Sequence, residues 1–385
     1  MWCNGSLHIK NKTAGTWHGV FISIIASLML PAFAAVAQER ADDGVRSGGM
    51  GGAYMGIADD VNGIRFNPSG LVYSPRQLLI EFSTENLFGS GLPFSNNLIN
   101  EGNVTLSSLG VVYNHLEKPN RTTPVLAMAG KGLAVPLNNG HKPMPTGNVF
   151  SVGFMGNFLN TGLLNEMSLR AFVSKGFFEK NTPLSGINHR PHLLALSVTG
   201  KLWGYQYDSA IAEHAQVNAE VEREAIRDFF AKNGRNQYSL GLDFGASVNL
   251  HVRARAGLGL INVVQPNLGL AATSRFPRSV RGGLAVLLKP DWHWLVAADL
   301  EKQENFDDLK FFIGSESMAP GLRTEALKLR LGANRNWLSA GFKLAVFTID
   351  VNYAFLFFLR NDGLYNHRLS LSYSRRPRAN GAGGY

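Results

Sequence analysis

The sequence has almost no cysteine, and this absence limits the chemistry that the protein can use. Its only cysteine, Cys3, lies at the beginning of the chain. A single thiol cannot form an intramolecular disulfide, and it cannot build a metal site from several thiolates. We therefore expect neither feature.

Only one long apolar run occurs, residues 20–37, and it stands near the beginning of the chain. It ends in the small residues Ala35 and Ala37, which polar residues follow, as in a secretory signal peptide cleaved after Ala37. A membrane-spanning anchor is the alternative, but Pro31 and the small residues favour cleavage. We expect residues 1–37 to be a signal peptide that directs export.

The basic residues form no long block, although the formal net charge is +9. The one local cluster, Arg375–Arg378, belongs to a glycine-rich stretch, 375–385, that we expect to be a flexible tail. Elsewhere the basic residues are interleaved with apolar ones, and this pattern does not indicate nucleic-acid binding. A basic exported protein can instead contact anionic lipid.

Motifs of common enzymes are also missing. The sequence has no G-x-S-x-G nucleophile elbow and no G-x-x-x-x-G-K-[ST] phosphate loop. His189 and His192 have a spacing that suits a metal, but no acidic residue lies near them, and Pro191 indicates a loop. We predict no enzyme activity, no metal site and no cofactor.

What the sequence does contain is strict alternation of apolar and polar residues. The segment 238–252 keeps this pattern throughout, and so do 293–302, 326–333, 347–355 and 368–374. Such alternation is useful only to a β-strand with one apolar face.

The strands are long, about nine to fifteen residues, whereas strands of globular proteins average five or six. A tilted strand that crosses a bilayer needs about nine to eleven residues. Short turns near His251 and 289–291 contrast with the longer connection 266–278, as in outer-membrane barrels. A soluble β-sandwich is the alternative, but strand length, strand number and the signal peptide favour an all-β transmembrane antiparallel β-barrel over residues 76–374.

Fifteen segments have the strand pattern. Bacterial barrels have an even number of strands, so we predict about 14 and expect one segment to be false. The third and eleventh segments have the weakest pattern. The fifteen segments are 77–88, 105–116, 124–136, 147–159, 167–178, 191–203, 236–250, 252–263, 278–289, 292–302, 307–314, 325–333, 336–345, 346–357 and 365–374.

One helix, at about 208–232, interrupts the strands. Asp208 or Ser209 can cap its beginning, and Asn233-Gly234 can end it. If all nine later strands exist and the last one runs toward the periplasm, the helix lies outside the cell. It can cover the pore, bind a partner or fill a loop, and loop filling is the favoured interpretation.

Charged residues on the polar faces of the strands should line the lumen. They either set selectivity and hold a plug, or pair with one another to fill the interior, and the second interpretation is favoured for each residue taken singly. Aromatic residues near strand ends fit an interfacial girdle or, alternatively, the core: Trp203, Tyr205, Trp292, Trp294 and Trp337. The expected lumen residues are Asp243, Arg253, Arg255, Asp299, Glu301, Lys328, Arg330, Asp350 and Arg368.

A glycine-rich stretch, 47–72, precedes the first strand. It is not a dinucleotide loop, because Tyr54 stands where G-x-G-x-x-G needs glycine and no strand comes before it. Its glycines permit tight turns, and a short helix capped by Asp59 or Asp60 can follow. We predict that residues 38–75 fold back into the barrel as a small N-terminal plug.

The segment GGMGGAYMGIADDVNGIRFNPSGLV resembles the N-terminal signature of the PorV/PorQ-like proteins, in the superfamily of the FadL long-chain fatty acid transporter. A second similarity covers 238–302, and a third is the final HRLSLSYS. Ser69 departs from the usual alanine, and a tail follows Tyr373, so that the aromatic residue of the last strand is not terminal. The matching positions are Gly51, Gly52, Ala53, Ala58, Asp59, Asp60, Asn67, Pro68, Gly70 and Leu71.

The resemblance implies a fourteen-stranded, plugged barrel in the outer membrane of a Gram-negative cell, in contact with outer-membrane lipid. PorV-type members act in type IX protein secretion, and the signature favours this function, with secreted proteins or secretion components as partners. FadL-type members transport fatty acids and other hydrophobic small molecules, which is the alternative. The plug residues that the motif indicates are Gly51, Gly52, Asp59, Asp60, Asn67, Pro68 and Gly70.

Overall fold

The computed structural model describes most of the barrel and the segment before it. The described residues are 44–74, 76–86, 105–116, 149–160, 164–179, 192–207, 220–251, 253–270, 273–289, 293–319, 326–359 and 365–375. The expected signal peptide, residues 1–37, lies outside them. So does the expected tail, except Arg375, which ends the last strand.

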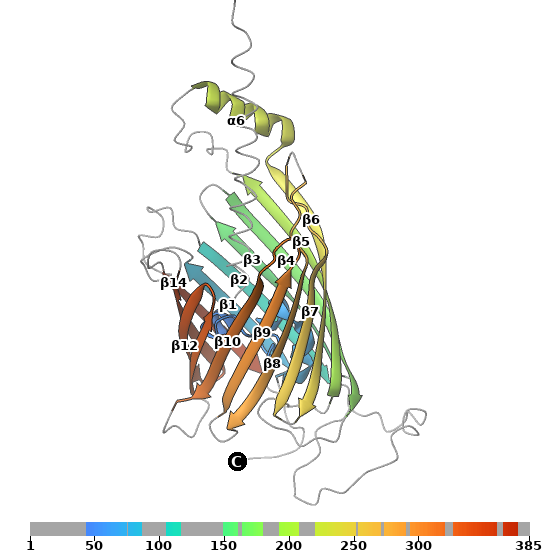
Figure 1. Ribbon diagram of the computed structural model, residues 1–385, viewed down its shortest axis with the longest axis vertical. Helices are drawn as coiled ribbons and strands as arrows, with labels where there is room; N and C mark the ends of the chain where they lie inside the picture. Colours follow the sequence, from blue (N-terminus) through green and yellow to red (C-terminus); the bar gives the residue numbers. More distant parts are fainter. Residues whose placement is uncertain are drawn as a thin grey trace, which may run out of the picture.

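Fourteen antiparallel strands form a closed ring, which confirms the predicted fold class (Figure 1). Each strand pairs with its neighbours in the sequence, and the first pairs with the last, so that no edge is left open. The strands are β1 (Leu78–Asn86), β2 (Thr105–Leu116), β3 (Val149–Asn160), β4 (Leu164–Glu179), β5 (His192–Tyr207), β6 (Asn236–His251), β7 (Ala254–Val264), β8 (Ser279–Lys289), β9 (Trp294–Gln303), β10 (Leu309–Met318), β11 (Leu327–Asn334), β12 (Trp337–Val346), β13 (Ile349–Phe358) and β14 (Tyr365–Arg375).

The ring is complete without one of the fifteen expected strands. The segment 124–136 lies outside the described residues, and β2 pairs directly with β3 along its whole length. The other weak segment, 307–314, is a strand, because β10 pairs with both β9 and β11.

Apolar side chains cover the outer face of the ring. Within each strand the exposed residues alternate with buried ones, because successive side chains point to opposite sides of a sheet. No helix among the described residues is long and apolar enough to cross a membrane. Exposed large apolar residues occur on every strand, for example Phe82, Leu109, Phe154, Leu169, Leu196, Phe244, Leu258, Leu284, Leu300, Phe311, Leu331, Leu338, Phe357 and Leu371.

The helix α6 (Glu220–Asn233) lies beyond one end of the ring, between β5 and β6 (Figure 1). Its expected beginning at Asp208 or Ser209 falls outside the described residues, and its last helical residue, Asn233, agrees with the expected end. Since β6 and β14 run in the same direction, the beginning of β6 and the end of β14 must lie at opposite rims.

Residues 44–74 lie inside the ring, in the half away from α6 (Figure 1). They form α2 (Val45–Gly49), α3 (Gly63–Phe66) and the 3-10 helix η1 (Pro68–Tyr73), and we call this segment the plug. Nearly all its residues are buried. Neither expected residue is the N-cap of the short helix: α3 begins after Asn62, which has no side-chain cap. Asp60 accepts a hydrogen bond from the backbone N–H of Asn62 at 2.9 Å, and Asp59 pairs with Arg46.

Candidate functional site

The plug lies so close to the barrel wall that its backbone needs glycine on both sides of the contact. Gly51 and Gly52 have φ angles of 65° and 90°, which favour glycine. A Cβ atom on Gly51 would overlap the backbone of Ala333 in β11. On the wall, a Cβ atom on Gly332 would overlap the backbone of Gly51, and one on Gly257 would overlap the carbonyl oxygen of Met55.

Arg46 is the centre of a buried ion cluster that joins the plug to the wall. Its guanidinium donates two hydrogen bonds of 2.9 Å to Glu316 of β10. It also donates to Asp59 at 2.7 Å and to Asp60 at 3.1 Å, both within the plug. Glu316 in turn accepts a 2.7 Å hydrogen bond from Arg330 of β11. One cation of the plug is therefore shared among three carboxylates, and the wall holds the strongest of these contacts in bidentate geometry.

The charges of this cluster reinforce one another. Burial alone would lower the pKa of Arg46, but the carboxylates, Glu316 first among them, outweigh burial and raise that pKa well above its ordinary value. Burial alone would raise the pKa of Asp59, but the guanidinium groups of Arg46 and Arg255 lower it below its ordinary value. Both groups consequently stay charged at neutral pH, and the ion cluster remains intact.

A second polar contact holds the middle of the plug. Asp299 of β9 accepts hydrogen bonds from the backbone N–H groups of Tyr54 at 2.7 Å and Met55 at 3.0 Å. Arg281 of β8 pairs with the same carboxylate at 3.1 Å and donates to the carbonyl oxygen of Gly52. Since these backbone groups are not paired in regular secondary structure, the wall satisfies them in place of water.

Arg255 of β7 holds the next turn of the plug. Its guanidinium donates to the carbonyl oxygens of Gly56 at 2.8 Å and Ile57 at 2.7 Å, and it lies 3.9 Å from Asp59. It also lies over the ring of Tyr73, 4.9 Å from the centroid. A buried cation here is tolerated because its charge meets carbonyl oxygens, a carboxylate and an aromatic face.

The end of the plug is held by neutral groups. Asn67 donates to Ser247 of β6 at 3.0 Å and to the carbonyl oxygen of Ala246 at 2.9 Å. The Ser69 hydroxyl lies 2.7 Å from the Ser247 hydroxyl. The plug thus carries its ionic contacts near α2 and its neutral ones near η1.

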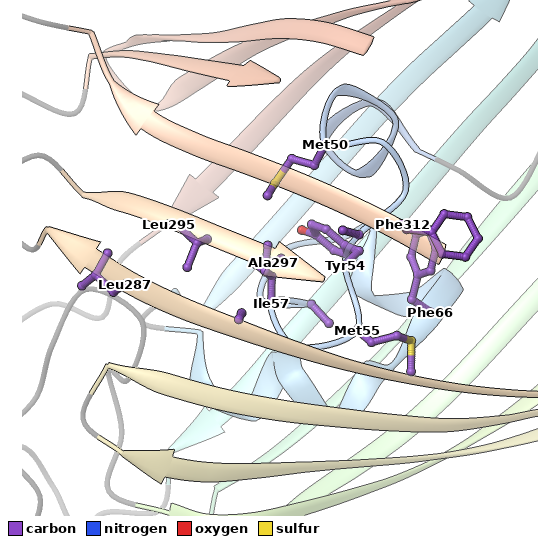
Figure 2. Packing of buried hydrophobic residues seen from close by; sticks show 12 residues of the cluster. Met50, Tyr54, Met55, Ile57, Phe66, Leu287, Leu295, Ala297 and Phe312 are labelled. Carbon is purple, nitrogen blue, oxygen red and sulfur yellow. The ribbon is translucent and has the colours of Figure 1, made fainter. Parts of the chain in front are cut away.

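An apolar cluster completes the contact between the plug and β8–β10 (Figure 2). In Figure 2 the side chains of Met50, Tyr54 and Met55 come from the plug. They lie between the wall residues Leu287 and Leu295 on one side and Phe312 on the other. The Tyr54 and Phe66 rings are 5.5 Å apart. Ion pairs, backbone contacts and apolar packing therefore all hold the plug in one position.

Of the nine expected lumen residues, eight lie on inward positions. Arg255, Asp299 and Arg368 contact the plug, the last through the carbonyl oxygen of Gly44 at 3.4 Å. The prediction is wrong for Arg253. Its side chain is exposed in the turn between β6 and β7, because β7 begins only at Ala254. The other five pair with neighbouring charges: Asp243 with Lys201, Glu301 with Arg281, Lys328 and Arg330 with Glu316, and Asp350 with Lys343 and Arg76.

The expected motif residues of the plug have separate places in it. Gly51 and Gly52 form the close turn against β11, and Asp59 and Asp60 bind Arg46. Asn67 contacts β6, as described above. The Pro68 carbonyl oxygen accepts a hydrogen bond from Ser174 of β4 at 3.1 Å, and a Cβ atom on Gly70 would overlap Ala58.

Aromatic residues line the interior toward α6, where part of a membrane girdle was expected. Trp203 and Tyr205 of β5 point inward and cluster with Phe230 of α6 and Phe276. Trp337 of β12 is also interior, and it packs in a cluster with Val45 of the plug. For these three residues the girdle interpretation was wrong and the alternative, a place in the core, is correct, because each shares a strand face with inward polar side chains. Trp294 is exposed on the outer face, and Trp292 lies outside the described residues.

The residues that hold the plug most firmly were missed in the sequence. Arg46 and Glu316 are 270 positions apart, and no local pattern connects them. Lys201 was missed as well, although it binds both Asp243 at 2.8 Å and Asn262 at 2.6 Å. The available signal for Arg46 was its place directly before a glycine-rich stretch that carries the adjacent acids Asp59 and Asp60.

The described residues contain no group of three or more His, Cys, Asp or Glu side chains that could bind a metal ion. What the arrangement can do is block one half of the lumen with a firmly held plug. The other half presents aromatic side chains to the interior.

No protein-family model matches the chain, and no curated protein sequence matches it. Among solved structures it is similar to the CymD monoaromatic hydrocarbon channel, with a TM-score of 0.51 and 12% identity over 87% of this chain and 97% of that one. It is similar to the Ralstonia pickettii toluene transporter TbuX, with a TM-score of 0.50 and 12% identity over 86% and 98% of the two chains. At this identity the likeness shows a shared fold.

Proposed function

We propose that this chain is an outer-membrane channel that admits hydrophobic small molecules into a plugged lumen. The observation that carries the proposal is the division of the interior: a plug held by ions fills one half, and aromatic side chains line the other. Ions and sugars meet a blocked lumen, whereas a hydrophobic molecule meets aromatic surface on which it can bind.

Placement in a membrane is supported by the outer face. Apolar side chains are exposed on every strand, and a closed ring leaves no unpaired strand edge to face hydrocarbon. A water-soluble protein with this much exposed apolar surface would aggregate. The expected signal peptide and the fold shared with two channels agree with an outer-membrane location.

The sequence motif favoured protein secretion, and this function has no separate support in the structure. The motif residues are explained by the packing of the plug, which a secretion barrel and a transport channel would both need. The fold likeness to a hydrocarbon channel and a toluene transporter favours transport, so we rank transport first.

Uptake into vesicles tests the proposal. A phospholipid bilayer is itself permeable to hydrophobic molecules, so the vesicles should carry lipopolysaccharide in the outer leaflet as the barrier. We expect the protein to accelerate entry of ethylbenzene but not of arabinose, compared with vesicles that lack it. Equal entry of ethylbenzene with and without the protein would refute transport. Faster entry of arabinose would show an open pore.

A further inference from the structure

The turn between β12 and β13 carries the most exposed large apolar side chain of the described residues. Phe347 is 102% exposed, and with Thr348 it forms a hairpin loop of two residues. The φ angle of Phe347 is 57°, in the left-handed region. Hairpin loops of this length place glycine or asparagine at such positions, because a bulky side chain is strained there. A strained and fully exposed phenylalanine needs a physical reason.

The outward rows of both strands lead into this turn without a polar break. Val346 stands opposite Ile349 in the register, and Leu344 stands opposite Val351. Val346, Ile349 and Leu344 are all exposed. On the next strand, Tyr373 of β14 stands opposite Ile349 and is exposed as well. The apolar outer surface of the barrel therefore continues to the tip of this hairpin.

The charges of the same hairpin lie on its inner side. Lys343 pairs with Asp350 at 2.7 Å, and Arg76, which follows the plug, pairs with the same carboxylate at 3.2 Å. Lys343 and Asp350 are buried. Since successive side chains of a strand point to opposite sides of the sheet, the hairpin has a charged inner side, an apolar outer side and an apolar tip.

The other two short turns at the same rim have a different character. All three turns share this rim because β6, β8 and β12 run in the same direction. Between β6 and β7, His251 and Arg253 are exposed. Between β8 and β9, the segment 289–293 carries Lys289 and His293. Such residues suit water or lipid headgroups, whereas the turn between β12 and β13 has no charged residue and lies beside an unbroken apolar surface.

We infer that this turn is a membrane anchor: the Phe347 ring enters the hydrocarbon of the leaflet at the rim away from α6. A phenyl ring has no polar group that would keep it among the headgroups. The turn backbone lies at the boundary with the headgroups, since strand pairing reaches Val346 and Ile349 and the Thr348 carbonyl oxygen accepts from the Ser374 N–H at 3.2 Å. The inference rests on the membrane placement that supports the proposed function.

A tryptophan at position 347 measures the depth of the turn. Phe347→Trp is compared with Arg253→Trp, the matched control in a polar turn of the same rim, and both are folded into vesicles of lipid brominated near the headgroups. We expect the lipid to quench the indole of Phe347→Trp strongly and that of Arg253→Trp little, and aqueous acrylamide to show the reverse order. The other tryptophans of the expected mature chain are replaced by phenylalanine: Trp203, Trp292, Trp294 and Trp337.

A glycine variant with all native tryptophans tests the inference independently. Phe347→Gly removes the ring and relieves the left-handed strain, whereas Asn305→Gly changes a residue with a φ of 70° in an exposed turn at the other rim. We expect Phe347→Gly to lower the folding equilibrium constant in vesicles about tenfold, because lost burial of the ring outweighs the relief of strain. Asn305→Gly should change it by less than about twofold.

An unchanged or higher constant for Phe347→Gly would overturn the inference, since relief of strain without loss of lipid contact leads to that result. Strong acrylamide quenching of Phe347→Trp would also overturn it and would place the ring in water. Protection from both quenchers would overturn it in favour of contact with another protein chain. In each case ethylbenzene can still enter vesicles. Failure of the proposed function is distinct: a barrel whose Phe347→Trp indole is quenched by lipid would admit no ethylbenzene.

Discussion

Replacement of Arg46 by methionine should loosen the plug more than the loss of any exposed charge on the described residues. Methionine keeps much of the apolar stem but removes the guanidinium that Glu316, Asp59 and Asp60 share. Among the described residues, Asp59 would then keep only Arg255, at 3.9 Å, as a cationic neighbour. Two carboxylates of the plug would be left buried without adequate compensation.

The expected cost is about 3 kcal/mol, since removing one partner of a buried pair usually costs about 3–5 kcal/mol and these aspartates are partly exposed. That energy corresponds to about a 150-fold increase in the equilibrium constant for local opening of the plug. Arg335→Met is the matched control. It removes the exposed ion pair with Asp308, and a surface pair contributes less than about 1 kcal/mol.

Amide hydrogen exchange of the plug, followed by mass spectrometry in micelles, measures this opening directly. We expect faster exchange throughout 44–74 in Arg46→Met and little change there in Arg335→Met. Glu316→Gln should accelerate exchange at least as much, because it leaves Arg46, Arg330 and Lys328 close together without their shared carboxylate. Equal exchange in Arg46→Met and Arg335→Met would refute the assignment of Arg46 as the main attachment of the plug.

Three further results are expected. The pKa of Asp59 is lowered in the folded protein, so the stabilisation by its carboxylate is complete above the unfolded pKa of about 3.9 and is lost as the pH falls further. The difference in plug exchange between the wild type and Asp59→Asn should therefore be constant from about pH 5 to 8 and should shrink below about pH 4. Gly332→Ala should displace the plug at Gly51 and raise protease cleavage within 44–74, whereas Gly156→Ala, where the Cβ atom meets nothing within 4 Å, should not. Leu284→Arg places a charge on the outer face and should reduce folding into vesicles by up to about 2–4 kcal/mol, and an unchanged folded fraction would argue against a lipid-facing surface there.

Most of the barrel could be predicted from the sequence because alternation is a local property. The pattern in 238–252 separates the outward Leu240 from the inward Ser247 without knowledge of any other strand. The same reasoning placed eight expected charged residues on inward positions and failed for Arg253, where the strand boundary shifted by two residues.

The contents of the lumen could not be predicted in the same way. An inward face of a barrel strand can carry aromatic as well as polar residues, so composition alone did not reveal that Trp203 and Trp337 point inward. The partners of Arg46 depend on how a short segment lies against strands that come more than two hundred positions later. Such contacts are properties of the closed ring, and no window of the sequence contains both partners.

Quenching of tryptophan fluorescence by brominated lipid tests the central claim, that the outer wall meets hydrocarbon while the aromatic clusters face a plugged lumen. Variants that each retain one tryptophan, Trp294, Trp203 or Trp337, are folded into vesicles with brominated acyl chains. The outer Trp294 should be strongly quenched, and the two interior indoles should be quenched little. Strong quenching of Trp203 and Trp337 with an unquenched Trp294 would contradict the account.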